Sequence, residues 1–201
     1  MVDYNRKSRK AYNKKADGYD DSFEGRFTLK FRELLLSEIT LDVNANVLDV
    51  ACGNGSLLAA LNKKTPINGF GIDIAENMIK NASVKNPDMV FRTSGCESIP
   101  FEDNSMDLIT VSAAYHHFPD TTAFAKEANR VLKTKGKIYI AEIYLPLFLR
   151  MILNPFVPLM PDGDVKFYSP KKIIRNFERF GFQKIDIKIH GSIQIVALQK
   201  L

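Results

Sequence analysis

The 201-residue sequence has no tryptophan and only two cysteines, Cys52 and Cys96. Two cysteines are too few for a disulfide framework or a zinc–thiolate cluster, so both kinds of small stapled scaffold are excluded. Hydrophobic residues make up 45% and charged residues 25% of the chain, which excludes an intrinsically disordered composition. We therefore expect one globular domain spanning residues 1–201, with a core of ordinary size.

A long uninterrupted hydrophobic run is also missing. The N-terminal residues are polar and basic, which argues against a secretory signal and favours a cytoplasmic protein. Ile143–Met160 contains one charge, Arg150, but prolines at positions 146, 155 and 158 rule out a continuous membrane-spanning helix there. We interpret residues 144–168 as a lid-like insertion, with a pocket wall or a subunit contact as alternatives. The oligomeric state stays open.

The net charge of +5 is unevenly distributed. Residues 1–15 carry six basic side chains against one acidic, and residues 166–201 carry eight against two. The intervening residues 16–165 carry fourteen basic side chains against twenty acidic. The chain therefore has basic ends around an acidic middle, and this distribution disfavours a nucleic-acid partner.

Short apolar runs alternate with helical periodicities along the chain. Strands are predicted at 45–51, 68–73, 89–93, 106–113 and 137–143, and two alternating runs at 183–189 and 193–199 predict a hairpin. This alternation predicts an α/β fold with a doubly wound, mostly parallel seven-stranded sheet and an antiparallel C-terminal hairpin strand.

The helices between these strands have recognisable ends. Asp120 and the pair Ser169-Pro170 are typical of helix N-termini. Gly136 is expected to end the helix that starts at Asp120, and Gly181 the helix that starts at Ser169. Residues 1–40 precede the first strand, and we expect them to form a helical cover.

A glycine-containing loop follows the first predicted strand. Gly53 and Gly55 allow a tight turn, and they let a ligand lie against bare main chain at the start of a helix. Asp73 stands at the end of the second predicted strand, where a carboxylate can accept hydrogen bonds from both hydroxyls of a ribose. The order strand, loop, helix, strand and acid therefore predicts a cofactor containing adenosine.

Two such cofactors compete. The dinucleotide fingerprint requires a third glycine three residues after the second, and Leu58 occupies that position, which argues against an NAD-dependent oxidoreductase. Asp49, an anion directly before the loop, suits an ammonium group better than a phosphate. The combination favours S-adenosylmethionine, which carries an ammonium and a sulfonium.

Several segments in order resemble the motifs of class I S-adenosylmethionine-dependent methyltransferases. These segments are VLDVACGNG (47–55), GFGIDIAENMI (69–79), SIPFEDNSMDLI (98–109), VSAAYHHFPD (111–120) and EANRVLKTKGKIYIAE (127–142). The opening AYNKKADGYDDS (11–22) is similar to the N-terminal cover of the small-molecule branch that includes ubiquinone/menaquinone-biosynthesis methyltransferases. The resemblance implies a Rossmann-like fold and S-adenosylmethionine as cofactor.

The resemblance also implies roles for individual residues. Asp49 would bind the methionine ammonium and Asp73 the ribose, while Ile74 and Met78 would flank the adenine. The family often has an acid that meets the adenine amino group, and Gly95 stands in its place, so Cys96 main chain or another side chain would recognise adenine. The remaining expected cofactor contacts, some weighed against plain packing or turn-capping roles, are Tyr12, Ala51, Cys52, Gly53, Gly55, Glu97, Ser112 and Ala113.

His116 and His117 follow the fourth predicted strand, at the edge where catalytic groups gather in open α/β sheets. Either histidine could act as a general base, and the alternative is a structural role in the loop before Pro119. No third ligand stands at helical spacing from them, so no metal site is expected. No firm catalytic residue follows from the sequence.

The favoured function is methyl transfer from S-adenosylmethionine to a small, apolar or aromatic acceptor. An alternative of another class is an RNA or protein methyltransferase, suggested by the basic ends. A third reading is a non-catalytic module that binds S-adenosylmethionine, suggested by the missing acid at Gly95. The acceptor and its reacting atom do not follow from the sequence.

Overall fold

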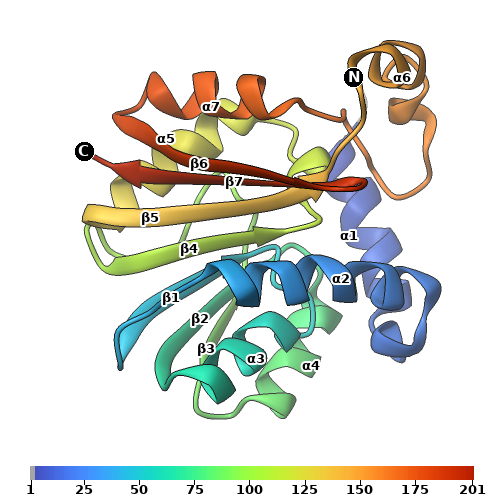
Figure 1. Ribbon diagram of the computed structural model, residues 1–201. Coiled ribbons are helices and arrows are strands. Elements are labelled where there is room, and N and C mark those ends of the chain that lie inside the picture. Colours follow the sequence, from blue (N-terminus) through green and yellow to red (C-terminus); the bar gives the residue numbers. More distant parts are fainter. Residues whose placement is uncertain (1–2) are drawn as a thin grey trace.

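A computed structural model describes residues 3–201 and contains one seven-stranded sheet (Figure 1). Its strands lie in the order β3-β2-β1-β4-β5-β7-β6. Their bounds are β1 Ala45–Val50, β2 Ile67–Asp73, β3 Val90–Thr93, β4 Met106–Ser112, β5 Leu132–Ile143, β6 Phe182–His190 and β7 Ile193–Lys200. Neighbouring strands from β3 to β5 pair in parallel, whereas β7 runs antiparallel to both β5 and β6. The expected doubly wound sheet with one antiparallel hairpin strand is confirmed.

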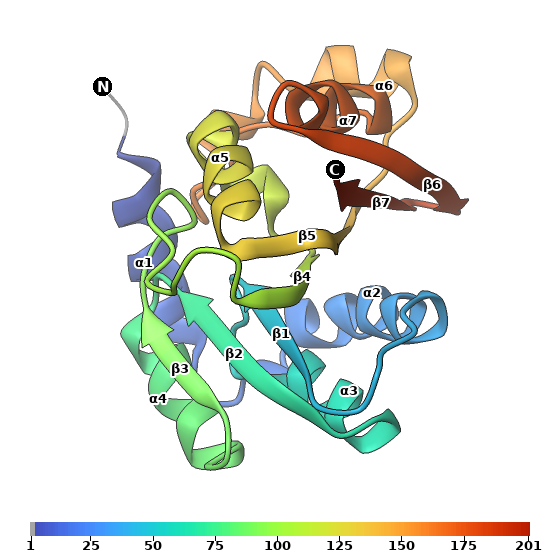
Figure 2. The same ribbon diagram turned by 90° about the vertical axis from the view of Figure 1, so that its left-hand side faces the viewer.

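Helices cover both faces of this sheet (Figure 2). On one face lie α2 (Phe23–Glu38), α3 (Ser56–Lys64) and α4 (Glu76–Lys85); on the other lie α5 (Thr121–Val131) and α7 (Pro170–Glu178). Side chains of β1 alternate between the two sides: Leu48 and Val50 belong to the cluster under α5 and α7, and Val47 to the cluster under α2 and α3. Burial on both faces is what the continuous apolar runs of parallel strands require.

Two helix N-termini have the caps that the sequence predicts. The Asp120 carboxylate accepts hydrogen bonds from the backbone N–H groups of Thr122 and Ala123, both at 2.9 Å. The Ser169 hydroxyl accepts one from the Lys172 N–H, and Pro170 begins α7. These caps satisfy N–H groups that have no partner within the helix.

Gly136 does not end α5, and that expectation was wrong. The helix ends at Val131 and β5 begins at Leu132, which pairs with Met106 of β4 before the register shifts by a bulge. Lys135 lies in the left-handed region at φ 67°, and a Cβ on Gly136 would come within 2.8 Å of the Lys133 carbonyl oxygen. The glycine therefore serves a bulge inside the strand rather than a helix terminus.

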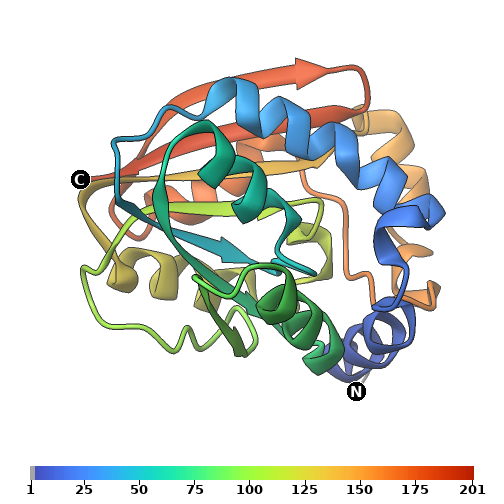
Figure 3. The same cartoon turned by 90° about the horizontal axis from the view of Figure 1, so that it is seen from below.

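Two segments outside the alternating pattern lie together beyond the carboxyl ends of the strands (Figures 1 and 3). The first contains α1 (Tyr4–Lys15) and the 3-10 turn η1 (Tyr19–Asp21) ahead of α2; the second contains α6 (Leu147–Leu153) and the 3-10 turn η3 (Val157–Leu159). The Ser8 hydroxyl donates to the Asp162 carbonyl at 3.0 Å, and Lys15 pairs with the Asp162 carboxylate at 2.8 Å. Among residues 3–201, no helix is both long and apolar enough to cross a membrane.

Candidate cofactor-binding site

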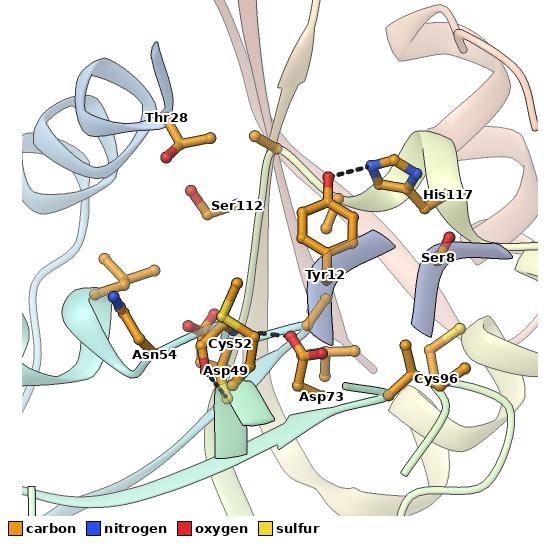
Figure 4. A pocket seen from close by; sticks show the side chains of 18 of the residues that line it. Ser8, Tyr12, Thr28, Asp49, Cys52, Asn54, Asp73, Cys96, Ser112 and His117 are labelled. Carbon is orange, nitrogen blue, oxygen red and sulfur yellow. Dashed lines mark hydrogen bonds between the residues drawn. The ribbon is translucent and has the colours of Figure 1, made fainter. Parts of the chain in front are cut away.

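A pocket lies at the carboxyl ends of β1, β2 and β4, beneath α1 (Figure 4). Open α/β sheets bind ligands at this edge, beside the point where the strand order reverses between β1 and β4. The pocket walls come from the loop after β1, the ends of β2 and β4, the loop after β3, and the helices α1 and α2. Side chains and main chain of Tyr12, Thr28, Asp49, Ala51, Gly53, Asp73, Ile74, Met78, Gly95, Ser112 and His117 are among its lining.

The loop after β1 exposes main chain to the pocket. Ala51, Gly53 and Gly55 all have left-handed φ angles, of 60°, 53° and 77°. A Cβ built on Gly53 would meet no atom within 4 Å, so the space beside its backbone is open. A ligand can therefore lie directly against the peptide groups ahead of α3.

Asp73 connects this loop to the end of β2. Its carboxylate accepts hydrogen bonds from the Gly53 N–H at 2.9 Å and from the Ala75 N–H at 2.8 Å. The residue is 9% exposed, and burial raises the pKa of its carboxyl group, although these N–H donors oppose the rise. Asp73 thus holds the glycine loop and still borders the pocket.

Asp49 is more deeply buried, at 2% exposure, in the middle of the sheet edge. Its carboxylate accepts a hydrogen bond from the Thr110 hydroxyl of β4 at 2.7 Å. Burial is the main cause that raises the pKa of Asp49 to about 7. A cationic group entering the pocket would restore the ionised form by direct attraction.

Tyr12 of α1 closes the pocket from above (Figure 4). Its hydroxyl lies 3.0 Å from the Nε2 atom of His117, and the two rings meet edge to face. Tyr19 lies 6.3 Å from Tyr12 between ring centroids and also lines the pocket. Burial raises the pKa of Tyr12 well above its ordinary value, so its hydroxyl stays protonated.

A buried polar cluster adjoins Tyr12. His116 Nδ1 lies 2.8 Å from Glu142 Oε1, and His116 Nε2 lies 3.3 Å from Asp164 Oδ1. Burial disfavours a charged His116, but the negative charges of Glu142 and Asp164 prevail and raise its pKa to about 10. For His117, burial and the neighbouring positive charge lower the pKa to about 3, so this ring is neutral.

Comparison with known proteins identifies the family. Residues 48–140 match the model of a family described as "Methyltransferase domain". A demethylmenaquinone methyltransferase of Staphylococcus aureus is 34% identical over 185 residues, which cover 79% of this chain and 76% of that protein. The chain belongs to the class I S-adenosylmethionine-dependent methyltransferases.

A ubiquinone/menaquinone biosynthesis C-methyltransferase of Rickettsia typhi is also 34% identical, over 158 residues and 70% of this methyltransferase. The match spans 63% of the Rickettsia protein's length. The resemblance inferred from the motif series, including its similarity to the quinone-biosynthesis branch, is thereby confirmed.

Solved structures agree on the fold. A SAM-dependent methyltransferase of Aquifex aeolicus superimposes with a TM-score of 0.73 at 22% identity, over 94% of this chain and 98% of that one. A chain of the complex between the Haloferax volcanii Trm112 methyltransferase activator and a methyltransferase gives a TM-score of 0.81 at 19% identity, over 94% and 96%.

Most residues that the sequence nominates for the cofactor line this pocket in the methyltransferase. Three do not. Gly55 faces away, because a Cβ there would meet Asn86 at 2.8 Å and Phe91 at 3.0 Å. Glu97 lies behind Gly95, with one carboxylate oxygen 2.7 Å from where a Gly95 Cβ would stand. His116 points to Glu142 and Asp164, which leaves His117 as the histidine that borders the pocket.

The two cysteines line the pocket with buried side chains. Both are buried, and burial raises the pKa of each thiol, so the thiolate form is disfavoured. The Cys52 sulfur lies 2.8 Å from where a Cβ on Gly71 would stand. Gly71 of β2 therefore leaves room for the Cys52 thiol beneath the loop after β1.

Other lining residues carry no signal in the sequence. Thr28 and Arg32 come from α2, and Asn5 and Ser8 from α1, so their proximity depends on how the N-terminal helices fold over the sheet. Asn54 is an exception: it lies inside the glycine loop, and its position alone could have nominated it. Thr110 lies behind the lining, where it donates to Asp49, and it could be found only from the β1–β4 register that pairs the two residues.

Proposed function

We propose that this methyltransferase binds S-adenosylmethionine in the pocket and transfers its methyl group to a small, apolar or aromatic acceptor. The observation that carries the proposal is the pair of buried carboxylates, Asp49 and Asp73, on either side of the open glycine loop. Asp49 is placed to receive the methionine ammonium, and Asp73 to receive the ribose hydroxyls. Ile74 and Met78 supply an apolar wall for the adenine.

Adenine recognition uses Cys96 main chain and the neighbourhood of Glu97. Gly95 leaves the position of the family's usual acid without a side chain, and the Glu97 carboxylate stands next to it. One Glu97 oxygen is buried and has no hydrogen-bond partner among residues 3–201. A small rotation of this side chain would bring a free acceptor to the adenine edge of the pocket.

We assign the acceptor side of the pocket to the N-terminal cover and the turn after β4. Tyr12, Tyr19 and Phe118 place aromatic rings at the pocket wall. The names of the relatives refer to quinone biosynthesis, and these rings support an aromatic acceptor here as well. We assign residues 144–168 as the lid of a single domain spanning 1–201, since Lys15 and Ser8 of α1 bind this segment directly.

The protein's contribution to the reaction is positioning and exclusion of water. The sulfonium of bound S-adenosylmethionine supplies a leaving group that is already activated, so an in-line transfer requires alignment of the acceptor more than an acid. Tyr12 and Tyr19 cover the pocket and keep water out. His117 borders the pocket, and its Nε2 atom lies 3.0 Å from the Tyr12 hydroxyl, so this ring helps to hold Tyr12 over the pocket.

Calorimetric titration with S-adenosylmethionine, S-adenosylhomocysteine and NAD tests the proposal. We expect the first two to bind and NAD not to bind. In Asp73→Asn the loss of charged hydrogen bonds, at about 1.5–3 kcal/mol, lowers the affinity for both adenosyl ligands roughly 10- to 100-fold. Asp103→Asn, a change at an exposed carboxylate, is the matched control and leaves the affinity unchanged.

Binding of NAD without either adenosyl ligand would overturn the cofactor assignment. Adenosyl binding that survives in Asp73→Asn at full strength would remove the ribose role of Asp73. If the cofactor binds, incubation with hydroquinones and other phenolic compounds, followed by mass spectrometry, then tests the acceptor class. Methylated RNA or protein in parallel incubations, with no methylated small molecule, would contradict that part of the proposal.

A further inference from the structure

Three potential metal ligands converge beside the cofactor pocket. His116 and His117 belong to the 3-10 turn η2 (Tyr115–His117) after β4, and Asp164 belongs to the segment 144–168. One ligand atom from each residue lies within 4.8 Å of the other two. Asp164 Oδ1 lies 3.3 Å from His116 Nε2 and 3.7 Å from His117 Nδ1.

These separations suit a small metal ion. Tetrahedral zinc binds nitrogen and oxygen ligands at about 2.0–2.2 Å, which puts neighbouring ligand atoms roughly 3.4 Å apart. The two distances to Asp164 Oδ1, 3.3 Å and 3.7 Å, lie close to that spacing. His117 Nδ1 is buried and has no hydrogen-bond partner among residues 3–201, so one donor already faces the cluster unused.

The second nitrogen of each histidine is held from outside the cluster. His116 Nδ1 lies 2.8 Å from the Glu142 carboxylate, and His117 Nε2 lies 3.0 Å from the Tyr12 hydroxyl. Histidines that bind metals almost always have their other ring nitrogen fixed in this way, because it orients the ring and sets the tautomer. Both histidines of the cluster have this support.

The charge of the surroundings also fits a dication. Glu142 is 0% exposed and Asp164 is buried, so two carboxylates flank the His116 ring out of water. A divalent ion bound by His116 and Asp164 would offset this buried negative charge.

We propose that His116, His117 and Asp164 form a binding site for a divalent metal ion of the zinc class. Two imidazoles and one carboxylate are a ligand set that zinc accepts, and three protein ligands leave a fourth position for water or an oxygen of another molecule. The ion ties the segment 144–168 to the turn after β4. Because His117 and Tyr12 line the cofactor pocket, the ion also fixes the wall of that pocket.

Metal titration of the full-length protein tests the site. After removal of bound ions with a chelator, we expect calorimetry to show one zinc ion per chain, and cobalt(II) to give the visible absorption of a tetrahedral site. Asp164→Asn and His117→Gln each reduce zinc affinity at least tenfold. The control is His190→Ala, which changes the third histidine of the sequence, at the exposed end of β6. This variant leaves zinc affinity and stoichiometry unchanged.

The readout needs neither cofactor nor acceptor, so it succeeds or fails separately from the proposed methyl transfer. Circular dichroism and a thermal melt of each variant show whether it is folded, and Asp164→Asn is nearly isosteric for this purpose. The absence of zinc binding by the wild type would overturn the proposal. Equal zinc affinity in wild type and Asp164→Asn, or loss of binding in His190→Ala, would do the same.

Discussion

At the scale of single residues, Asp49 shows how a binding site conflicts with stability. Within residues 3–201 the carboxylate accepts one side-chain hydrogen bond, from Thr110, while burial removes it from water. Burial of a carboxylate disfavours its charged form and raises its pKa. In the free protein burial therefore favours the protonated carboxyl group of Asp49, and an incoming ammonium group would favour the ionised form.

This raised pKa predicts how stability depends on pH. The unfolded chain releases the Asp49 proton near pH 3.9, and the folded protein near pH 7. Between these values the folded state holds one more proton, so the contribution of Asp49 to the free energy of unfolding falls as pH rises, by about 1.4 kcal/mol per unit. This contribution to the free energy of unfolding is fully present below about pH 4 and lost above about pH 7.

Urea unfolding of the cofactor-free protein between pH 4.5 and 8 measures this effect. Asp49→Asn removes the titration, so we expect the variant to gain stability relative to the wild type as pH rises. Asp103→Asn serves as the control because its side chain is 68% exposed. Parallel pH profiles for wild type and Asp49→Asn would show that Asp49 is ionised in the free protein.

At the scale of elements, a set of polar contacts joins helix α1 to α4. The Asn13 side chain donates to the Glu76 carboxylate at 2.7 Å and accepts from the Asn77 N–H at 2.9 Å. The Asn77 side chain in turn donates to the Asn13 carbonyl at 3.1 Å. Asn13 thus caps the first turn of α4 and holds α1 over the pocket.

Asn13→Ala is therefore expected to loosen α1 without affecting the sheet. Loss of the two hydrogen bonds made by the Asn13 side chain costs about 1 kcal/mol, which corresponds to about a fivefold loss of S-adenosylmethionine affinity. Limited proteolysis should cut α1 faster in the variant. Lys10→Ala, at an exposed position of the same helix, should match the wild type in both measurements. Unchanged proteolysis in Asn13→Ala would mean that other contacts hold α1.

The elements differ in how far the sequence predicts them. Caps and parallel strands are local features, so Asp120, Ser169 and the run 106–113 could be interpreted correctly. The start of β5 depends on pairing between Leu132 and Met106, which lie far apart in sequence, and the glycine at 136 was therefore misread.

The residues of the site also differ in how far the sequence predicts them. Asp49, Gly53 and Asp73 belong to an ordered series of motifs, and the sequence nominated them for the pocket that they line. Asp164 carries no such signal, because the segment around it has no periodicity and meets His117 only through the tertiary fold. For this reason the sequence offered no third ligand for the two histidines.

At the scale of the whole molecule, the hydrophobic clusters on the two faces of the sheet are built on the same strands. Phe177 of α7 is 0% exposed, and its ring centroid lies 5.8 Å from that of Phe124 and 5.2 Å from that of Phe182. Alternate residues of β1 contribute to both hydrophobic clusters. A loss of packing on one face is therefore expected to weaken the entire fold.

Phe177→Ala tests this expectation. Removing a fully buried ring costs about 3–5 kcal/mol of unfolding free energy, through lost burial and the cavity that remains. Phe148→Ala makes the same chemical change on α6, where the ring is 71% exposed, and we expect an effect within about 0.5 kcal/mol. Chemical denaturation followed by circular dichroism and tyrosine fluorescence should show one transition. Two separate transitions in either variant would contradict the shared core.

The position of β7 has a consequence for synthesis on the ribosome. Strand β7 lies between β5 and β6 and pairs with both, although it is the last strand of the seven to be made. Until Ile193–Lys200 leaves the exit tunnel, the edge of β5 has no partner and β6 has nothing to join. A nascent chain with two such open edges is prone to pair with other chains. Pairing of β7 with β5 and β6 is therefore the step that completes the seven-stranded sheet and covers these two edges.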